Sequence, residues 1–229
     1  LGDNFEGIPL DALGTGPQLT PPRQYVTRDA AHLTPRVAST FSPIESLALG
    51  GLGGAWGAVS FPYLDSELER SGLIPATFRP HYDIVARRVG ISGPEEDDLR
   101  PFRGALAALQ PPLELDHNAS TILAKYQRRR ARSHQDGIYL GRPLRAALTQ
   151  PLDGRRPHAY HDMDFWSNKG GAVYRPALTL HALKRSEQLT YERPYLVESF
   201  SESGSSGNVI VRARSLSTQR YEQFVARRV

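Results

Sequence analysis

The sequence predicts a mixed α/β (α+β) fold that ends in a three-stranded antiparallel meander. Three observations indicate this class. Apolar stripes of helical period recur between prolines and glycines, whereas the C-terminal part alternates with a period of two. The chain has 229 residues, of which 39% are hydrophobic, and this is enough for a buried core. Its 18 prolines and 20 glycines predict long irregular connections between short elements.

Three helices are expected. The first starts at Arg79, with Pro80 in its first turn and Gly90 after its last turn. The second begins near Asn118 or Ser120 and carries basic residues in its later turns, which suits the helix dipole. The third is opened by Pro176, because a proline at the first helical position needs no backbone N–H.

The strands of the meander follow this third helix. Apolar residues from Leu189 to Val197 share one parity, and Pro194 interrupts them at what is expected to be an edge position. Residues 204–208 have turn chemistry, and alternating runs follow at 209–213 and 221–229. These three runs predict a simple up-and-down sheet.

Composition excludes several classes of partner. Lys and Arg exceed Asp and Glu by 28 − 24 = 4, and the basic residues are scattered among acidic ones, so no nucleic-acid partner is expected. The chain has no cysteine, which excludes disulfides, thiolate metal sites and a cysteine nucleophile. The uncharged stretch from Ser46 to Leu64 is broken by glycines and Pro62, so no membrane span is expected. Neither Leu1 nor Val229 resembles a natural terminus, so the sequence is interpreted as an interior segment. A cytoplasmic location is a separate expectation.

The most unusual local sequence runs from Gly50 to Ala58 and contains five glycines among nine residues. Such a segment lets backbone N–H groups approach a flat or anionic ligand without obstruction by side chains. A dinucleotide fingerprint needs a strand before it and a helix after it, whereas Pro43 precedes this segment and Pro62 follows it. No Gly-Lys-Ser/Thr ends the run, so it is not a P-loop. From composition alone, a tight turn and a ligand site remain equally open.

The segment from Ser46 to Tyr63 resembles the flavin-contacting loop of glucose-methanol-choline (GMC) type oxidoreductases, in particular the bacterial members near pyranose oxidase. Residues 160–166 and the run from Val173 to Leu183 are similar to the same group, as is the terminal meander. The resemblance extends from about Ser46 to Val229.

The resemblance implies part of a two-domain flavoprotein fold. Residues 1–75 would form an extended segment and the flavin-contacting loop of the FAD-binding domain. Residues 76–175 would form a helical and loop region that borders the substrate domain, and residues 176–229 the helix and meander of the FAD-binding domain. The implied function is oxidation of a CH–OH group of a sugar, polyol or other alcohol, with hydride transfer to flavin.

The resemblance also implies which residues contact the cofactor. The backbone near Gly57 would lie closest to the reactive edge of the flavin, and Val197 would meet the adenine end of FAD. Some pyranose oxidases attach FAD through a histidine where this chain has Ala55, so non-covalent FAD is expected. No catalytic residue is assigned, since the dinucleotide fingerprint and the catalytic histidine of the family would lie outside these 229 residues. The residues expected to line the isoalloxazine ring are Gly51, Gly53, Gly54, Ala55, Trp56 and Gly57.

Two alternative functions remain open. The first is a non-catalytic module that holds a saccharide with its Trp- and Tyr-bearing loops, and the second is a polyanion-binding domain that uses the basic run from Lys125 to Arg132. The basic run is interpreted as a solvated helix end. The acidic run from Glu95 to Asp98 is interpreted as an exposed loop. The cluster of His158, His161, Asp162 and Asp164 is interpreted as a surface turn, and no metal is expected.

Overall fold

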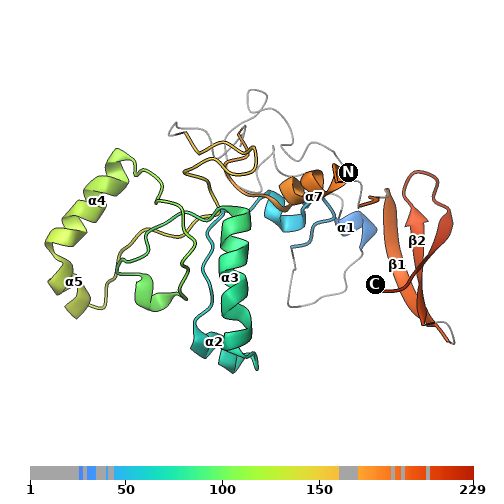
Figure 1. The fold of residues 1–229 in the computed structure, drawn as a ribbon, viewed down its shortest axis with the longest axis horizontal. Helices are drawn as coiled ribbons and strands as arrows, with labels where there is room; N and C mark the ends of the chain where they lie inside the picture. Colours follow the sequence, from blue (N-terminus) through green and yellow to red (C-terminus); the bar gives the residue numbers. More distant parts are fainter. Residues whose placement is uncertain are drawn as a thin grey trace. The chain divides into compact units, whose positions relative to one another are not determined.

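The structure of the protein is a computed structural model. It describes residues 26–27, 30–34, 40, 44–159, 170–186, 189–191, 194–204 and 207–229. In this part the chain forms two compact units (Figure 1). The first unit comprises residues from 26–54 and 176–229, and the second unit comprises residues 55–175. No helix of the described residues is long and apolar enough to cross a membrane.

The first unit confirms the mixed α/β class, because it combines helices with an antiparallel sheet of strand order β1-β2-β3. Its helical elements are α1 (Ala30–Leu33), the 3-10 turn η3 (Gly51–Gly54) and α7 (Pro176–Lys184). Its strands are β1 (Tyr195–Ser203), β2 (Asn208–Ser215) and β3 (Tyr221–Ala226). Both Pro176 as the helix start and the meander are therefore confirmed.

Strand β1 begins later in the chain than the sequence pattern predicts. It begins at Tyr195, one residue after Pro194, and Leu189 and Tyr191 lie outside it. Proline has no N–H to donate to a ladder, so pairing starts beyond it. An irregularity in the register lies between Val197 and Ser199.

The second unit carries the remaining helices. They are α2 (Asp65–Arg70), α3 (Pro75–Val89), the 3-10 turn η4 (Arg100–Phe102), α4 (His117–Arg128) and α5 (Arg130–Gln135). The helix predicted near Asn118 is α4, and Asp116 caps it by accepting a hydrogen bond from the Ala119 N–H at 2.7 Å.

Helix α3 starts four residues before the predicted Arg79. Pro75, not Pro80, occupies the first helical position, and Pro80 lies inside the helix. Pro80 has no N–H, so the helix continues through it at the loss of one backbone hydrogen bond. The end of the helix is as predicted, because Gly90 adopts φ of 79° and donates its N–H to the Ala86 carbonyl at 2.9 Å.

The core of the second unit is organised around a segment without long strands. Leu144, Ala146 and Leu148 are fully or almost fully buried, and the first two pack with residues of α3. Isolated β-bridges connect this segment to distant parts of the chain; they are Val59 with Arg145, Ser92 with Arg145, and Ala147 with Val173. Residues 144–148 therefore form the central buried segment of the second unit.

A polar cluster joins the loop before η4 to helices α4 and α5. Asp98 accepts hydrogen bonds from Tyr126 Oη and Arg130, and His134 Nε2 lies 2.9 Å from its carboxylate. The Asp98 side chain is only 10% exposed, so the interpretation of Glu95–Asp98 as an exposed loop is wrong for this residue. Tyr126 is buried, and the basic run is thus solvated only in part. Hydrogen bonds from Arg130 and then Tyr126 hold the pKa of Asp98 well below its usual 3.8.

We expect Asp98→Asn to destabilise the protein at neutral pH, because the ionised carboxylate and its contact with Arg130 are lost. A depressed carboxyl pKa stabilises the fold above the unfolded pKa, and this contribution disappears as the pH falls below it. The wild type should therefore have a higher free energy of unfolding than Asp98→Asn, with the largest difference above a pH of 3.8. This difference should decrease as the pH falls below that value. Denaturant unfolding across a pH series measures it. Asp65→Asn, which removes a more exposed contact with Arg79, is the control and should change little. A difference that stays constant into acid contradicts this assignment.

Candidate functional site

The first half of the glycine-rich segment forms η3 and packs against α7. A Cβ added to Gly53 would lie 2.7 Å from Pro176 Cγ and Cδ. A Cβ added to Gly50 would lie 3.0 Å from the Ala177 nitrogen. Real Cβ atoms do not approach this closely, so the helix contact by itself requires glycine at position 53.

Gly51 differs from Gly53 because nothing lies where its side chain would be. Its φ is +59°, and an added Cβ would meet no atom within 4 Å. Gly54, at the end of the turn, is buried. The turn thus presents bare main chain at Gly51 and uses Gly53 for packing.

The second half of the segment belongs to the second unit, where Ala55 is buried and Trp56 is anchored. Trp56 Nε1 donates a hydrogen bond to the Tyr174 carbonyl at 2.7 Å. The indole packs against the core and lines a hollow of about 350 Å³ together with Tyr82 and Tyr174. Trp56 therefore fixes the position of the next residue, Gly57.

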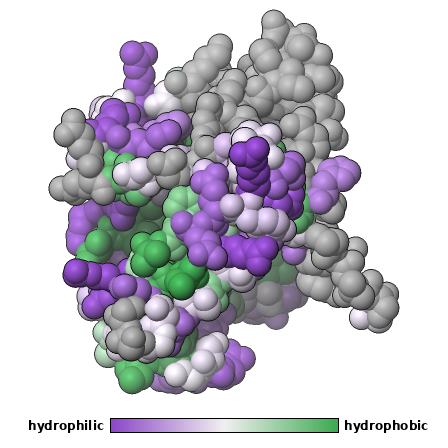
Figure 2. Space-filling model, turned by 90° about the vertical axis from the view of Figure 1, so that its right-hand side faces the viewer, coloured by the Kyte–Doolittle hydropathy of each residue, from purple (hydrophilic) through white to green (hydrophobic). Residues whose placement is uncertain are grey.

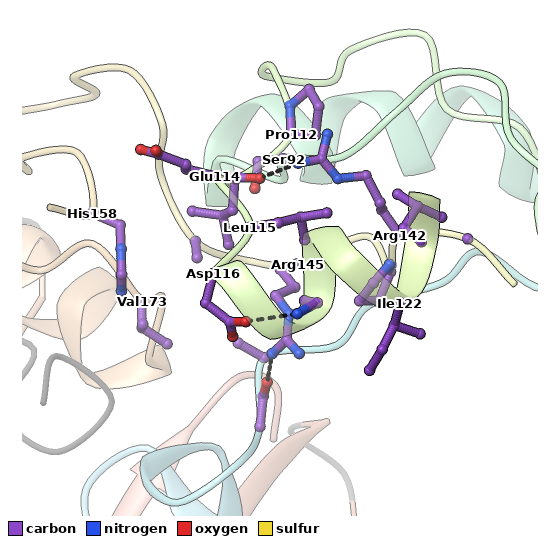
Figure 3. Close-up of a pocket in the computed structure, with 18 of the residues that line it drawn as sticks. Ser92, Pro112, Glu114, Leu115, Asp116, Ile122, Arg142, Arg145, His158 and Val173 are labelled. Atoms are coloured by element: carbon purple, nitrogen blue, oxygen red, sulfur yellow. Dashed lines mark hydrogen bonds between the residues drawn. The ribbon is translucent and has the colours of Figure 1, made fainter. Parts of the chain in front are cut away.

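Gly57 and Ala58 form part of the wall of a larger cavity, with a volume of about 590 Å³ (Figure 3). Small-molecule sites in proteins commonly have volumes of 300 to 1,000 Å³, given as rough bounds. Apolar lining comes from Leu113, Ile122 and Val173. The polar side chains on the wall are those of Ser92, Glu114, Asp116, Arg142, Arg145 and His158.

Two guanidinium groups on this wall are oriented by backbone carbonyls. Arg145 Nη1 donates to the Gly57 carbonyl at 3.1 Å, and Arg142 Nη2 donates to the Leu113 carbonyl at 2.7 Å. Dashed lines in Figure 3 mark both contacts. An Arg side chain has five N–H donors, so each group keeps further donors for a ligand.

Ser92 and Arg145 form a hydrogen-bonded backbone pair. The Ser92 N–H donates to the Arg145 carbonyl at 2.8 Å, and the Arg145 N–H donates to the Ser92 carbonyl at 2.9 Å. Directly opposed residues of an antiparallel pair project their side chains to the same face. Ser92 is 1% exposed, and its Oγ has no hydrogen-bond partner among the residues for which the structure gives positions.

The seven residues predicted to bind FAD divide between the two units. Gly51, Gly53, Gly54 and Val197 belong to the first unit, and Ala55, Trp56 and Gly57 belong to the second. Val197 lies on β1 and is 56% exposed.

On the face shown in Figure 2, hydrophobic surface gathers in patches between hydrophilic side chains.

No sequence motif marks Ser92 and Arg145, because they lie in segments without helical or strand periodicity. Their pairing joins residues 53 positions apart (145 − 92), and no local pattern predicts it. Of the four residues weighed as a metal cluster, His158 lies on the cavity wall, and the other three lie outside the described residues. Within the described ranges no group of three or more potential metal ligands occurs.

Fold and site together define a mixed α/β protein with a cavity of small-molecule size. No protein-family model matches the chain, and no curated protein matches it either. Its function has to be inferred from the glycine-rich segment and the cavity beside it.

Proposed function

We propose that the protein is an FAD-dependent oxidoreductase, which oxidises a CH–OH group of a sugar, polyol or other alcohol. The observation that carries this proposal is the bare main chain of the glycine-rich segment, which is open at Gly51 and lines a cavity of about 590 Å³ at Gly57. Flavin is proposed as the ligand of this main chain because the segment from Ser46 to Tyr63 resembles the flavin-contacting loop of GMC-type enzymes.

The residues present fit a flat ring system. A ring can lie directly against a main chain that has no side chain on the facing side, and Gly51 has such an open face. In this proposal Gly51, Gly53, Gly54, Ala55, Trp56 and Gly57 hold the isoalloxazine ring, and Val197 lies at the adenine end. Gly53 has an indirect role in this proposal: it lets η3 pack closely on Pro176 of α7, where a side chain at position 53 would clash. It thereby positions η3 for the flavin.

The bound flavin supplies the hydride acceptor for the alcohol carbon. The residues of this chain bind and orient. Trp56, tied to the Tyr174 carbonyl, keeps Gly57 at the wall of the cavity. The apolar part of the lining, with Leu113, Ile122 and Val173, limits the water around the substrate. None of these side chains is assigned as the base that takes the hydroxyl proton.

The proposal is tested by the flavin content of the full-length protein and of two matched variants. Gly51→Leu places a side chain on the open main chain, and Gly72→Leu is the control. Both glycines have positive φ, +59° and +72°, and an added Cβ meets nothing within 4 Å at either position. The backbone cost is therefore similar in the two variants. We expect the wild type and Gly72→Leu to be yellow and to release flavin on denaturation, and Gly51→Leu to lose most of it.

A colourless wild-type protein that does not take up added FAD would contradict the proposal. If that protein bound neutral sugars, it would be the non-catalytic saccharide-binding module weighed above. Equal flavin content in the two leucine variants would remove Gly51 from the cofactor site.

A further inference from the structure

We propose that the cavity beside Gly57 binds the carboxylate of an acidic sugar or hydroxy acid, through Arg145 and Ser92. The identification of this ligand as the oxidised substrate rests on the proposed function. The binding of the carboxylate is a separate property of the cavity.

The backbone pairing of Ser92 and Arg145 brings their side chains to the same wall. Their two reciprocal N–H···O bonds of 2.8 and 2.9 Å fix this register, and both residues line the cavity. A second anchor holds the Arg145 guanidinium, because its Nη1 donates to the Gly57 carbonyl. The guanidinium is thereby oriented before any ligand arrives.

Arg145 has no carboxylate partner among the described residues. Its other guanidinium N–H groups match the geometry of a carboxylate, which accepts two parallel hydrogen bonds from one Arg. A cation that lies on a cavity wall and forms no ion pair within the described part of the chain favours an anionic ligand.

Ser92 provides an independent observation. Its side chain is 1% exposed, it lines the cavity, and its Oγ lacks a hydrogen-bond partner in the part of the chain that the structure covers. A buried hydroxyl without a partner is unfavourable, and most buried polar groups are satisfied. A ligand oxygen held by Arg145 would satisfy it.

The charges around the cavity favour a monoanion over a doubly charged phosphate. Arg142 and Arg145 contribute two positive charges, and Glu114 and Asp116 contribute two negative charges. Both acids are exposed, and Asp116 is already engaged as the cap of α4. A carboxylate next to Arg145 is compensated locally, whereas a second negative charge would add repulsion from Glu114 and Asp116.

Isothermal titration calorimetry of the full-length protein with glucuronate, glucose and glucose 6-phosphate tests this proposal. Glucuronate and glucose differ at one carbon, which is a carboxylate in the former. We expect glucuronate to bind at least about tenfold more tightly than glucose, and more tightly than glucose 6-phosphate.

Two variants assign the binding to the two side chains. Arg145→Gln should reduce the affinity for glucuronate to the affinity that the wild type has for glucose. Ser92→Ala should weaken glucuronate binding and leave the stability of the protein unchanged or higher, since it removes an unsatisfied buried hydroxyl. Arg128→Gln is the control, because Arg128 Nε also donates to a backbone carbonyl, that of Ala124, but on an exposed helix face. It should bind glucuronate as the wild type does.

Equal affinity of the wild type for glucuronate and glucose would overturn the proposal. So would equal or tighter binding of glucose 6-phosphate, or unchanged glucuronate binding in both Arg145→Gln and Ser92→Ala. If Arg145→Gln does not fold, Ser92→Ala decides the result. Flavin content is measured on the same samples by absorbance. A colourless protein that does not take up added FAD but still prefers glucuronate would refute the oxidoreductase and retain the carboxylate site.

Discussion

Replacing Gly90 by alanine is expected to destabilise the protein by about 3 kcal/mol, the sum of a backbone and a packing cost. Gly90 ends α3 with φ of +79°, a conformation in which a Cβ is unfavourable by about 1 to 2 kcal/mol. The added Cβ would also overlap Leu148 Cδ2 and lie 3.0 Å from Leu152 Cδ2. Leu148 is completely buried, so it has little room to move. Denaturant unfolding measures the change.

Two comparisons separate the backbone cost from the packing cost. Gly137→Ala has φ of +72° and no neighbour within 4 Å, so it should show the backbone cost alone. The double variant Gly90→Ala with Leu148→Ala should be less destabilised than the sum of the two single variants, because the shortened side chain no longer overlaps the new Cβ. Additive effects, or equal effects of Gly90→Ala and Gly137→Ala, would show that the packing conflict is absent.

Leu144→Ala should destabilise the protein by about 2 to 5 kcal/mol, the range for large-to-small changes in a core. Leu144 has 0% exposure and packs in the core cluster with Ala86 and Val89 of α3. The residue that follows it, Arg145, makes the bridges to Val59 and Ser92, so a cavity at Leu144 should also loosen the wall of the binding cavity.

Chemical denaturation of Leu144→Ala checks this expectation, with Ile138→Ala as the matched control. Ile138 also lies outside the helices and strands, but it is 57% exposed, so its replacement should cost less than about 1 kcal/mol. A similar loss of stability in both variants would mean that residues 144–148 are not the centre of the core.

Some elements could be predicted because a few neighbouring residues determine them. Pro176 starts α7 where its fixed φ suits a helix, and Gly90 ends α3 where a positive φ is needed. The alternation after Pro194 produces the meander, since residues of one parity share a face of a strand. The prediction that Pro80 lies in the first turn of α3 was wrong, because the helix starts earlier, at Pro75, and tolerates Pro80 in its interior.

The polar interactions could not be predicted in this way. Asp98 looks like one of several exposed acids, and only its approach to Tyr126 and Arg130, 28 and 32 positions along the chain, reveals its role. The spacing of glycines around Trp56 likewise does not separate Gly53, which packs on Pro176, from Gly51, which stays open.

The sequence by itself therefore determined the start of α7, the end of α3, the meander and the exceptional glycine-rich segment, because these depend on backbone preferences and short-range periodicity. Only the tertiary structure decided which glycines are open and that Ser92 and Arg145 meet at one cavity. The reason is that contacts such as Trp56 with Tyr174, 118 positions apart, arise from packing of the whole unit and leave no local pattern.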